Sequence, residues 1–151
     1  MMMVKKRAAG TENWGMAWVC TCAAFGVHVI DEALFGFLEF WNPLVHSLRE
    51  RLPLLPLPTF RFGVWLGGLV VAVGLLFLLS PFAFGAARWM RPLSYLYAVV
   101  MCLNGLLHVS ASWSLGEAVP GVYSSPILVL AGVFMLVRLR RSQWEPEHAA
   151  R

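Results

Sequence analysis

Charged side chains are scarce in this sequence, and their scarcity argues against a soluble globular protein. Only 13% of the 151 residues are charged and 59% are hydrophobic, whereas a soluble domain has about 25% charged and about 45–50% apolar residues. The apolar residues also form long runs separated by short polar or proline-containing joints, a pattern typical of chains that cross a bilayer. We therefore predict an integral membrane protein and not a soluble globular domain.

Cysteine is rare as well, which argues against a disulfide framework or a thiolate metal site. The chain has three cysteines, an odd number, and all of them lie in apolar segments. Cys20 and Cys22 are two residues apart, so their side chains point to roughly opposite faces of a helix. We interpret these two and Cys102 as small apolar helix residues.

The net charge of +4 does not indicate a nucleic-acid partner. The cations lie at the ends of apolar segments, where membrane topology explains them better than a phosphate-binding surface does. We expect the lipid bilayer to be the main partner and expect no nucleic-acid binding. The apolar stretch from about Trp14 to Trp41 is too long for the core of a secretory signal, so we interpret it as an uncleaved first span.

Four apolar segments predict four transmembrane helices in one membrane domain that covers residues 1–151. Asn42-Pro43 is expected to end the first helix, since proline disfavours helix at the preceding residue. Between Leu52 and Pro58 the prolines are too closely spaced for a helix, so the joint 43–61 is expected to lie along the membrane surface. The predicted fold class is all-α, a polytopic four-helix bundle. The predicted spans are residues 16–40, 62–84, 92–112 and 120–137.

Basic residues in the joints predict the orientation of the chain. One side of the membrane holds only Arg49, Arg51 and Arg61, and the opposite side holds more basic residues. The positive-inside rule therefore places both termini in the cytoplasm, and the expected location is a bacterial plasma (inner) membrane. The basic residues expected on the cytoplasmic side are Lys5, Lys6, Arg7, Arg88, Arg91, Arg138, Arg140, Arg141 and Arg151.

Polar and ionisable side chains inside two of the predicted spans need an explanation. A charged side chain at the centre of a bilayer costs about 2.5–3.5 kcal/mol on insertion scales. Mutual pairing, a metal, a proton or a water-filled cavity must offset that cost. After Arg61 the second span has no ionisable residue, and the fourth has none before Arg138. The residues concerned are His28, Asp31, Glu32 and Glu39 in the first span, and Asn104 and His108 in the third.

The spacing of these residues predicts that they meet. His28 and Glu32 are four apart and share one helix face, which Asp31 borders. Asn104 and His108 are also four apart. Spans one and three run in the same direction, and at ~1.5 Å per residue His28 matches Asn104 in depth while Glu32 matches His108. We predict one polar cluster in the outer half of the bundle.

Two imidazoles with carboxylates are ligand types of zinc and of non-haem iron. We predict a divalent metal bound by His28, Glu32 and His108, with Asp31 as a fourth ligand or general base. Asn104 is expected to orient a ligand or contact the substrate. Metal-bound water would allow hydrolysis or oxygen chemistry. The predicted function is a metal-dependent hydrolase or non-haem iron oxidoreductase that acts on a lipid-like or membrane-soluble substrate entering from the outer leaflet.

The same cluster allows other interpretations. Without a metal, it would suit a proton-coupled transporter, a small-ligand-binding protein or a purely structural hydrogen-bonded knot. A haem held by His28 and His108 is disfavoured by their difference in depth of ~6 Å and by the adjacent acids. Glu39 lies near the outer interface, where we expect it to be solvated.

The segment His28-Val-Ile-Asp31-Glu32 resembles the signature of the HXXEE family, a group of small membrane proteins named for that motif. Family members carry a further histidine, which His108 resembles, and a Tyr-x-Pro-Gly motif, whose expected place is occupied by the segment 120–126. Two departures stand out: aspartate occupies the first acidic position, and the Tyr-x-Pro-Gly residues occur in a different order. The family has no established reaction, so the resemblance implies a site without naming a substrate.

Overall fold

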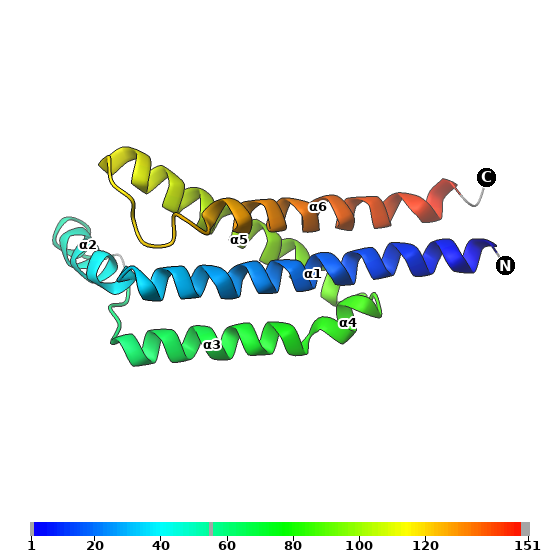
Figure 1. Cartoon of the computed structure of the whole chain (residues 1–151), viewed down its shortest axis with the longest axis horizontal. Coiled ribbons are helices and arrows are strands. Elements are labelled where there is room, and N and C mark those ends of the chain that lie inside the picture. The colour runs from blue at the N-terminus through cyan, green and yellow to red at the C-terminus, as the bar shows by residue number, and fades with distance from the viewer. Residues whose placement is uncertain (1, 55, 149–151) are drawn as a thin grey trace.

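The chain folds into helices joined by short turns and one proline-rich segment (Figure 1). The computed structural model describes residues 2–54 and 56–148, and the side chains of residues 14–54 and 56–141 among them. Throughout this described part every regular element is a helix, which confirms the all-α class. The helices are α1 (Met2–Leu34), α2 (Phe37–Arg51), α3 (Phe62–Leu78), α4 (Ser80–Phe84), α5 (Met90–Leu115) and α6 (Ser125–His148).

The first long helix ends earlier than predicted. It was expected to continue to residue 40 and to end at Asn42-Pro43, but α1 ends at Leu34 and Pro43 lies inside α2. Gly36 explains the break, because its φ of 76° is left-handed, a conformation that glycine adopts without steric cost and that commonly ends helices. The chain turns at Gly36 and starts a new helix, in which Pro43 forgoes only one backbone hydrogen bond.

The proline-rich segment is held against α2 by side-chain hydrogen bonds. Residues 52–54 and 56–61 form no helix, as the close spacing of prolines predicts. The Asn42 side chain donates to the carbonyl of Phe60 and accepts from its N–H. Trp41 Nε1 donates to the carbonyl of Pro58 at 3.0 Å. The segment is therefore an ordered connection that returns the chain from α2 to the start of α3.

The last helix starts later and continues further than predicted. It was expected to begin at residue 120, but residues 120–124 form a turn and α6 begins at Ser125. Gly121, with a φ of 91°, cannot be part of a right-handed helix. At the other end, α6 runs on through Arg138 to His148, because arginine is a good helix former and marks at most the end of the apolar part.

Within the part of the chain that the structure describes, three helical segments are long and apolar enough to cross a membrane: Trp14–Leu34, Phe62–Phe84 and Met90–Leu115. The second matches the predicted span 62–84, although a short break at Leu79 separates α3 from α4. The apolar part of α6, from Ser125 to Val137, is shorter than the ~20 residues that a spanning helix needs. The beginning of α1 and the end of α6 lie at the same end of the molecule (Figure 1).

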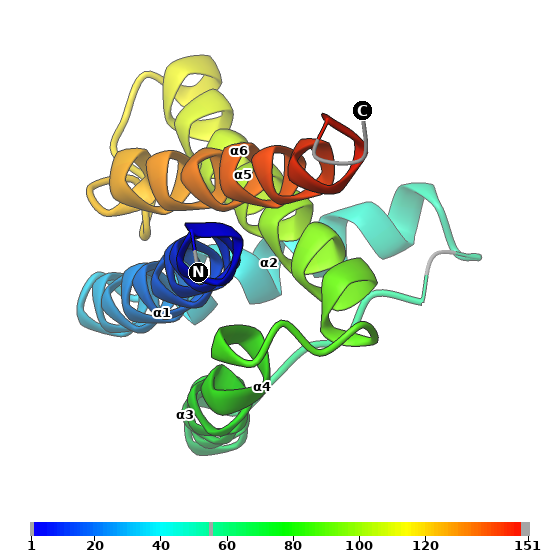
Figure 2. The same ribbon diagram turned by 90° about the vertical axis from the view of Figure 1, so that its right-hand side faces the viewer.

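Helix α6 packs along α1 and against α5, and α3 lies on the other side of α1 (Figures 1 and 2). The core between them contains Trp18, which donates from Nε1 to the carbonyl of Leu76 at 3.0 Å. Its ring contacts that of Tyr97 at a centroid distance of 5.2 Å, and the Tyr97 hydroxyl donates to the carbonyl of Thr21. These contacts fix α1 relative to α5 on one side of the polar cluster.

Candidate metal centre

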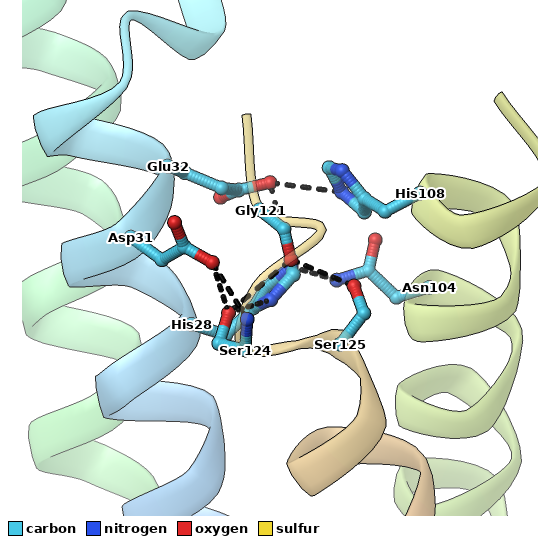
Figure 3. A network of polar contacts seen from close by, with 8 residues as sticks. All are labelled: His28, Asp31, Glu32, Asn104, His108, Gly121, Ser124 and Ser125. Atoms are coloured by element: carbon cyan, nitrogen blue, oxygen red, sulfur yellow. Dashed lines mark hydrogen bonds and ion pairs between the residues drawn. The ribbon is translucent and has the colours of Figure 1, made fainter. Parts of the chain in front are cut away.

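The polar stripes of α1 and α5 meet next to the turn that precedes α6 (Figure 3). His28 is fully buried, and Asp31, Glu32 and His108 are each less than 9% exposed, although a charged side chain is expensive to bury. The Asn104 amide nitrogen lies 3.0 Å from His28 Nε2, and His108 Nε2 lies 3.1 Å from Glu32 Oε1. The pairs predicted from depth, His28 with Asn104 and Glu32 with His108, are the pairs that make contact.

Three of these side chains direct one ligand atom each toward a common point. Glu32 Oε1 lies 3.1 Å from His108 Nε2 and 3.6 Å from His28 Nε2, and no two of the three ligand atoms are more than 4.8 Å apart. Ligands of a tetrahedral zinc ion, each at about 2.0–2.1 Å, lie roughly 3.3 Å from one another. Two of the three separations are close to this spacing, and the two histidine nitrogens, within 4.8 Å of each other, would have to move together to bind one ion.

A chain of hydrogen bonds holds the His28 ring in place. The Ser124 hydroxyl donates to Asp31 Oδ2 at 2.6 Å, and the Ser124 N–H donates to the same oxygen at 2.8 Å. Because a hydroxyl has one hydrogen, its oxygen accepts from His28 Nδ1–H, 2.8 Å away. This assigns the hydrogen of the neutral ring to Nδ1, and the Nε2 lone pair accepts a hydrogen bond from the Asn104 amide at 3.0 Å.

The structure does not bring Asp31 to the three ligand atoms. Its Oδ2 is occupied by Ser124, and its Oδ1 is buried without a hydrogen-bond partner. In this geometry Asp31 orients His28 through Ser124, as carboxylates orient metal-binding histidines in many metalloproteins. A buried oxygen without a partner is rare, and it remains available to accept a hydrogen bond from a bound molecule.

Gly121 places backbone directly against both imidazole rings. A Cβ atom at this position would lie 2.8 Å from His108 Nδ1 and 3.0 Å from His28 Cε1, closer than real Cβ atoms pack. The Gly121 carbonyl accepts a hydrogen bond from the buried Ser125 hydroxyl at 2.7 Å. Glycine is thus required here by its left-handed φ and by the absence of a side chain, and the turn covers the cluster from the α6 side.

The two histidine rings are too close for the haem alternative. Their centroids lie 4.8 Å apart in an edge-to-face arrangement, which leaves no space for a porphyrin between them. Phe37, the first residue of α2, packs on His108 with a centroid distance of 5.9 Å. The break at Gly36 therefore serves the site, because it directs the start of α2 over the cluster.

Residues at the edge of the predicted site lie outside the cluster. Glu39 is exposed, as expected for a group at the outer interface. Tyr123, at the place of the rearranged family motif, is 62% exposed and contacts Phe35 with a centroid distance of 5.1 Å. Neither side chain makes a described contact with His28 or His108.

Sequence reasoning missed the contributions of Ser124, Ser125 and Gly121. Serine and glycine in a polar turn carry no distinctive spacing, and their role depends on a turn that closes on α1, some ninety residues earlier in the chain. The one available signal was the Pro120-Gly121 pair, which lies where the resemblance placed a Pro-Gly element. Gly121 of this element places its backbone against the rings of His28 and His108, whereas the Tyr123 side chain is exposed.

A comparison with protein families matches residues 19–136 to the family described as "Protein of unknown function with HXXEE motif". The match covers most of the chain, so the protein belongs to the HXXEE family. The signature residues His28, Asp31 and Glu32 are those whose geometry is described above. No curated protein and no solved structure matched the chain.

Proposed function

We propose that this protein is a membrane-embedded, metal-dependent enzyme, with a divalent ion bound by His28, Glu32 and His108. The observation that carries the proposal is the convergence of three buried ligand atoms within 4.8 Å of one another. Two imidazoles and one carboxylate form the donor set of catalytic zinc sites and of non-haem iron(II) oxygenases. Three protein ligands leave a coordination position open, which is the arrangement of catalytic and not of structural zinc sites.

The proposal includes four membrane spans, with α6 as the fourth and both termini in the cytoplasm of a bacterial cell. Three described segments are long and apolar enough to be spans. The beginning of α1 and the end of α6 lie at the same end of the molecule (Figure 1), which fits an even number of crossings. Arg138, Arg140 and Arg141 follow the apolar part of α6, on the side where the positive-inside rule requires basic residues. In this topology the cluster lies in the outer half of the membrane.

A lipid-like substrate is favoured by an apolar groove that reaches the edge of the cluster at Asp31 and Ser124. The groove has a volume of about 310 Å³ and lies between α1 and the start of α6. Val27, Ile30 and Ile127 line it, each at least half exposed, and Asp31 and Ser124 form its polar part. An apolar molecule can reach Asp31 from the lipid phase through this groove without passing through water.

Within the site each side chain has a distinct task. A bound ion would supply a Lewis acid and lower the pKa of a coordinated water. Asp31 and Ser124 hold His28 in the ligating orientation. The Asn104 amide donates to the Nε2 lone pair, so this amide would have to turn away from Nε2 when an ion binds there. Asp31 lies at the end of the groove, and its buried Oδ1 has no hydrogen-bond partner among the described residues.

Metal analysis of the purified full-length protein tests this proposal. We expect about one zinc or iron per chain, and we expect His28→Ala and His108→Ala each to abolish stoichiometric metal. His46→Ala is the matched control, since His46 is exposed on α2 and should leave the metal content unchanged. Metal contents that are equal in all four proteins would refute the site, and the identity of the metal separates hydrolase from oxygenase chemistry.

The orienting role of Ser124 gives a second prediction. Ser124→Ala removes the hydroxyl that links Asp31 to His28, and loss of such outer contacts typically lowers metal affinity about 10–100-fold. We expect a decrease in this range in a competition titration with a chelator of known affinity. Ser80→Ala is the control, because the Ser80 hydroxyl is buried without a partner away from the site. Equal affinities of Ser124→Ala and wild type would show that the hydrogen-bonded chain does not support the ligand.

A further inference from the structure

A second cavity opens at the break between α1 and α2, on the outer side of the cluster. Its volume is about 520 Å³, and it is lined by residues 33–39 together with Phe62 at the start of α3. Three of the lining residues are phenylalanines, at positions 35, 37 and 62, and one is Glu39. Phe37 also packs on His108. The Phe37 ring therefore lines this cavity and contacts a residue of the candidate metal centre.

The electrostatics of this cavity favour a cation. Among the described residues, Glu39 has no Lys or Arg within ion-pair distance, and its carboxylate accepts no hydrogen bond. The C-terminal end of α1 lies in the same wall, at Ala33 and Leu34, and the end of a helix dipole carries partial negative charge there. Aromatic faces attract cations as well, particularly alkylammonium groups.

The occupant is indicated by the neighbouring groove. Leu34 and Phe35 line both the cavity and the apolar groove between α1 and α6, so the two spaces adjoin. From Leu34 the groove follows Ile30 and Val27 along one face of α1, a distance of ~10 Å toward the membrane centre. A polar cavity at the outer interface followed by an apolar groove toward the midplane matches the shape of a lipid, with its headgroup in the cavity and its chain in the groove.

We propose that the cavity at the α1–α2 break binds the ammonium headgroup of a zwitterionic lipid. Glu39 and the end of α1 supply the negative charge, Phe35 and Phe62 supply aromatic faces, and the groove takes one acyl chain. As a subsite for the substrate this inference rests on the proposed function, whereas lipid binding itself requires no metal. It restricts the substrate class to lipids that carry a positively charged ammonium group.

Native mass spectrometry of the full-length, chelator-treated protein in detergent tests the proposal. Phosphatidylethanolamine and phosphatidylcholine should each bind more tightly than phosphatidylglycerol, which has no ammonium group. Glu39→Gln should weaken binding of the two ammonium lipids about tenfold and leave phosphatidylglycerol unaffected. Phe62→Leu keeps an apolar side chain but removes the ring, and it should weaken binding of the two ammonium lipids about threefold. Glu117→Gln, at an exposed acid in the loop after α5, is the matched control and should have no effect.

Three results would overturn the inference. The first is unchanged binding of the ammonium lipids to Glu39→Gln, and the second is an equal loss for phosphatidylglycerol. The third is free choline or ethanolamine binding as tightly as the lipids, which would show that the groove contributes nothing. Because the protein is free of metal in this experiment, a negative result leaves the metal centre untouched, and a failed metal analysis leaves the lipid site untouched.

Discussion

Replacing Glu32 with alanine should lower the affinity for a divalent metal by on the order of 100-fold or more. Glu32 supplies the only carboxylate among the three converging ligands, and its Oε1 lies within 3.6 Å of both ligating nitrogens. Loss of a residue that only orients a ligand costs about 10–100-fold, so loss of a ligand should reach at least the upper end of that range. A chelator-competition titration of the variant and the wild type measures the effect.

Glu117→Ala serves as the control for this change, because it removes a carboxylate of the same type from an exposed loop. Its metal affinity should equal that of the wild type. If Glu32→Ala also retained wild-type affinity, the ion would have to be held without the carboxylate that joins the two histidines. The proposed centre would then be wrong even if the protein contained metal.

Gly121→Ala should lower the free energy of unfolding by roughly 2–5 kcal/mol and abolish stoichiometric metal binding. The estimate combines about 1–2 kcal/mol for a left-handed alanine with about 1–3 kcal/mol for forcing a methyl group into packed surroundings. The new Cβ would lie 2.8 Å from His108 Nδ1 and 3.0 Å from His28 Cε1, so the rings must separate. Chemical denaturation in detergent and metal analysis measure the two effects.

The chain provides a matched control for the backbone part of this effect. Gly116 also has a left-handed φ, 71°, but a Cβ there would meet nothing within 4 Å. Gly116→Ala should therefore cost only about 1–2 kcal/mol and leave the metal content unchanged. If the two variants behaved alike, close approach of Gly121 to the histidines would not be what makes glycine necessary at that position.

The contacts between α1 and α5 in the site could be predicted because they depend on helical spacing. His28 and Glu32, like Asn104 and His108, lie one turn apart on helices that run in the same direction. The rise per residue of a helix therefore predicts that His28 pairs with Asn104 and Glu32 with His108. Both contacts, at 3.0 Å and 3.1 Å, join the residues expected at equal depth. Local periodicity is sufficient for such a prediction, and the family resemblance added His108 independently.

The remaining parts of the site depend on information that periodicity does not contain. The break at Gly36 was missed because Pro43, a stronger helix breaker by composition, lies only seven residues later, where the helix tolerates it. The role of Ser124 was missed because it arises from a turn that packs on α1 across the fold. Asp31 was accordingly predicted to be a ligand or base, and the contact with Ser124 shows the orienting geometry that spacing could not reveal.

X-ray absorption spectroscopy of the metal-loaded, full-length protein tests the central claim most directly, because it reports the ligands of the ion itself. The site predicts a spectrum with two imidazole ligands, with the remaining scattering from oxygen. His108→Ala should lose one imidazole contribution, and His46→Ala should lose none. A spectrum with sulfur ligands, with no imidazole, or with two imidazoles still present in His28→Ala and His108→Ala would contradict the assignment of His28, Glu32 and His108 as a metal centre.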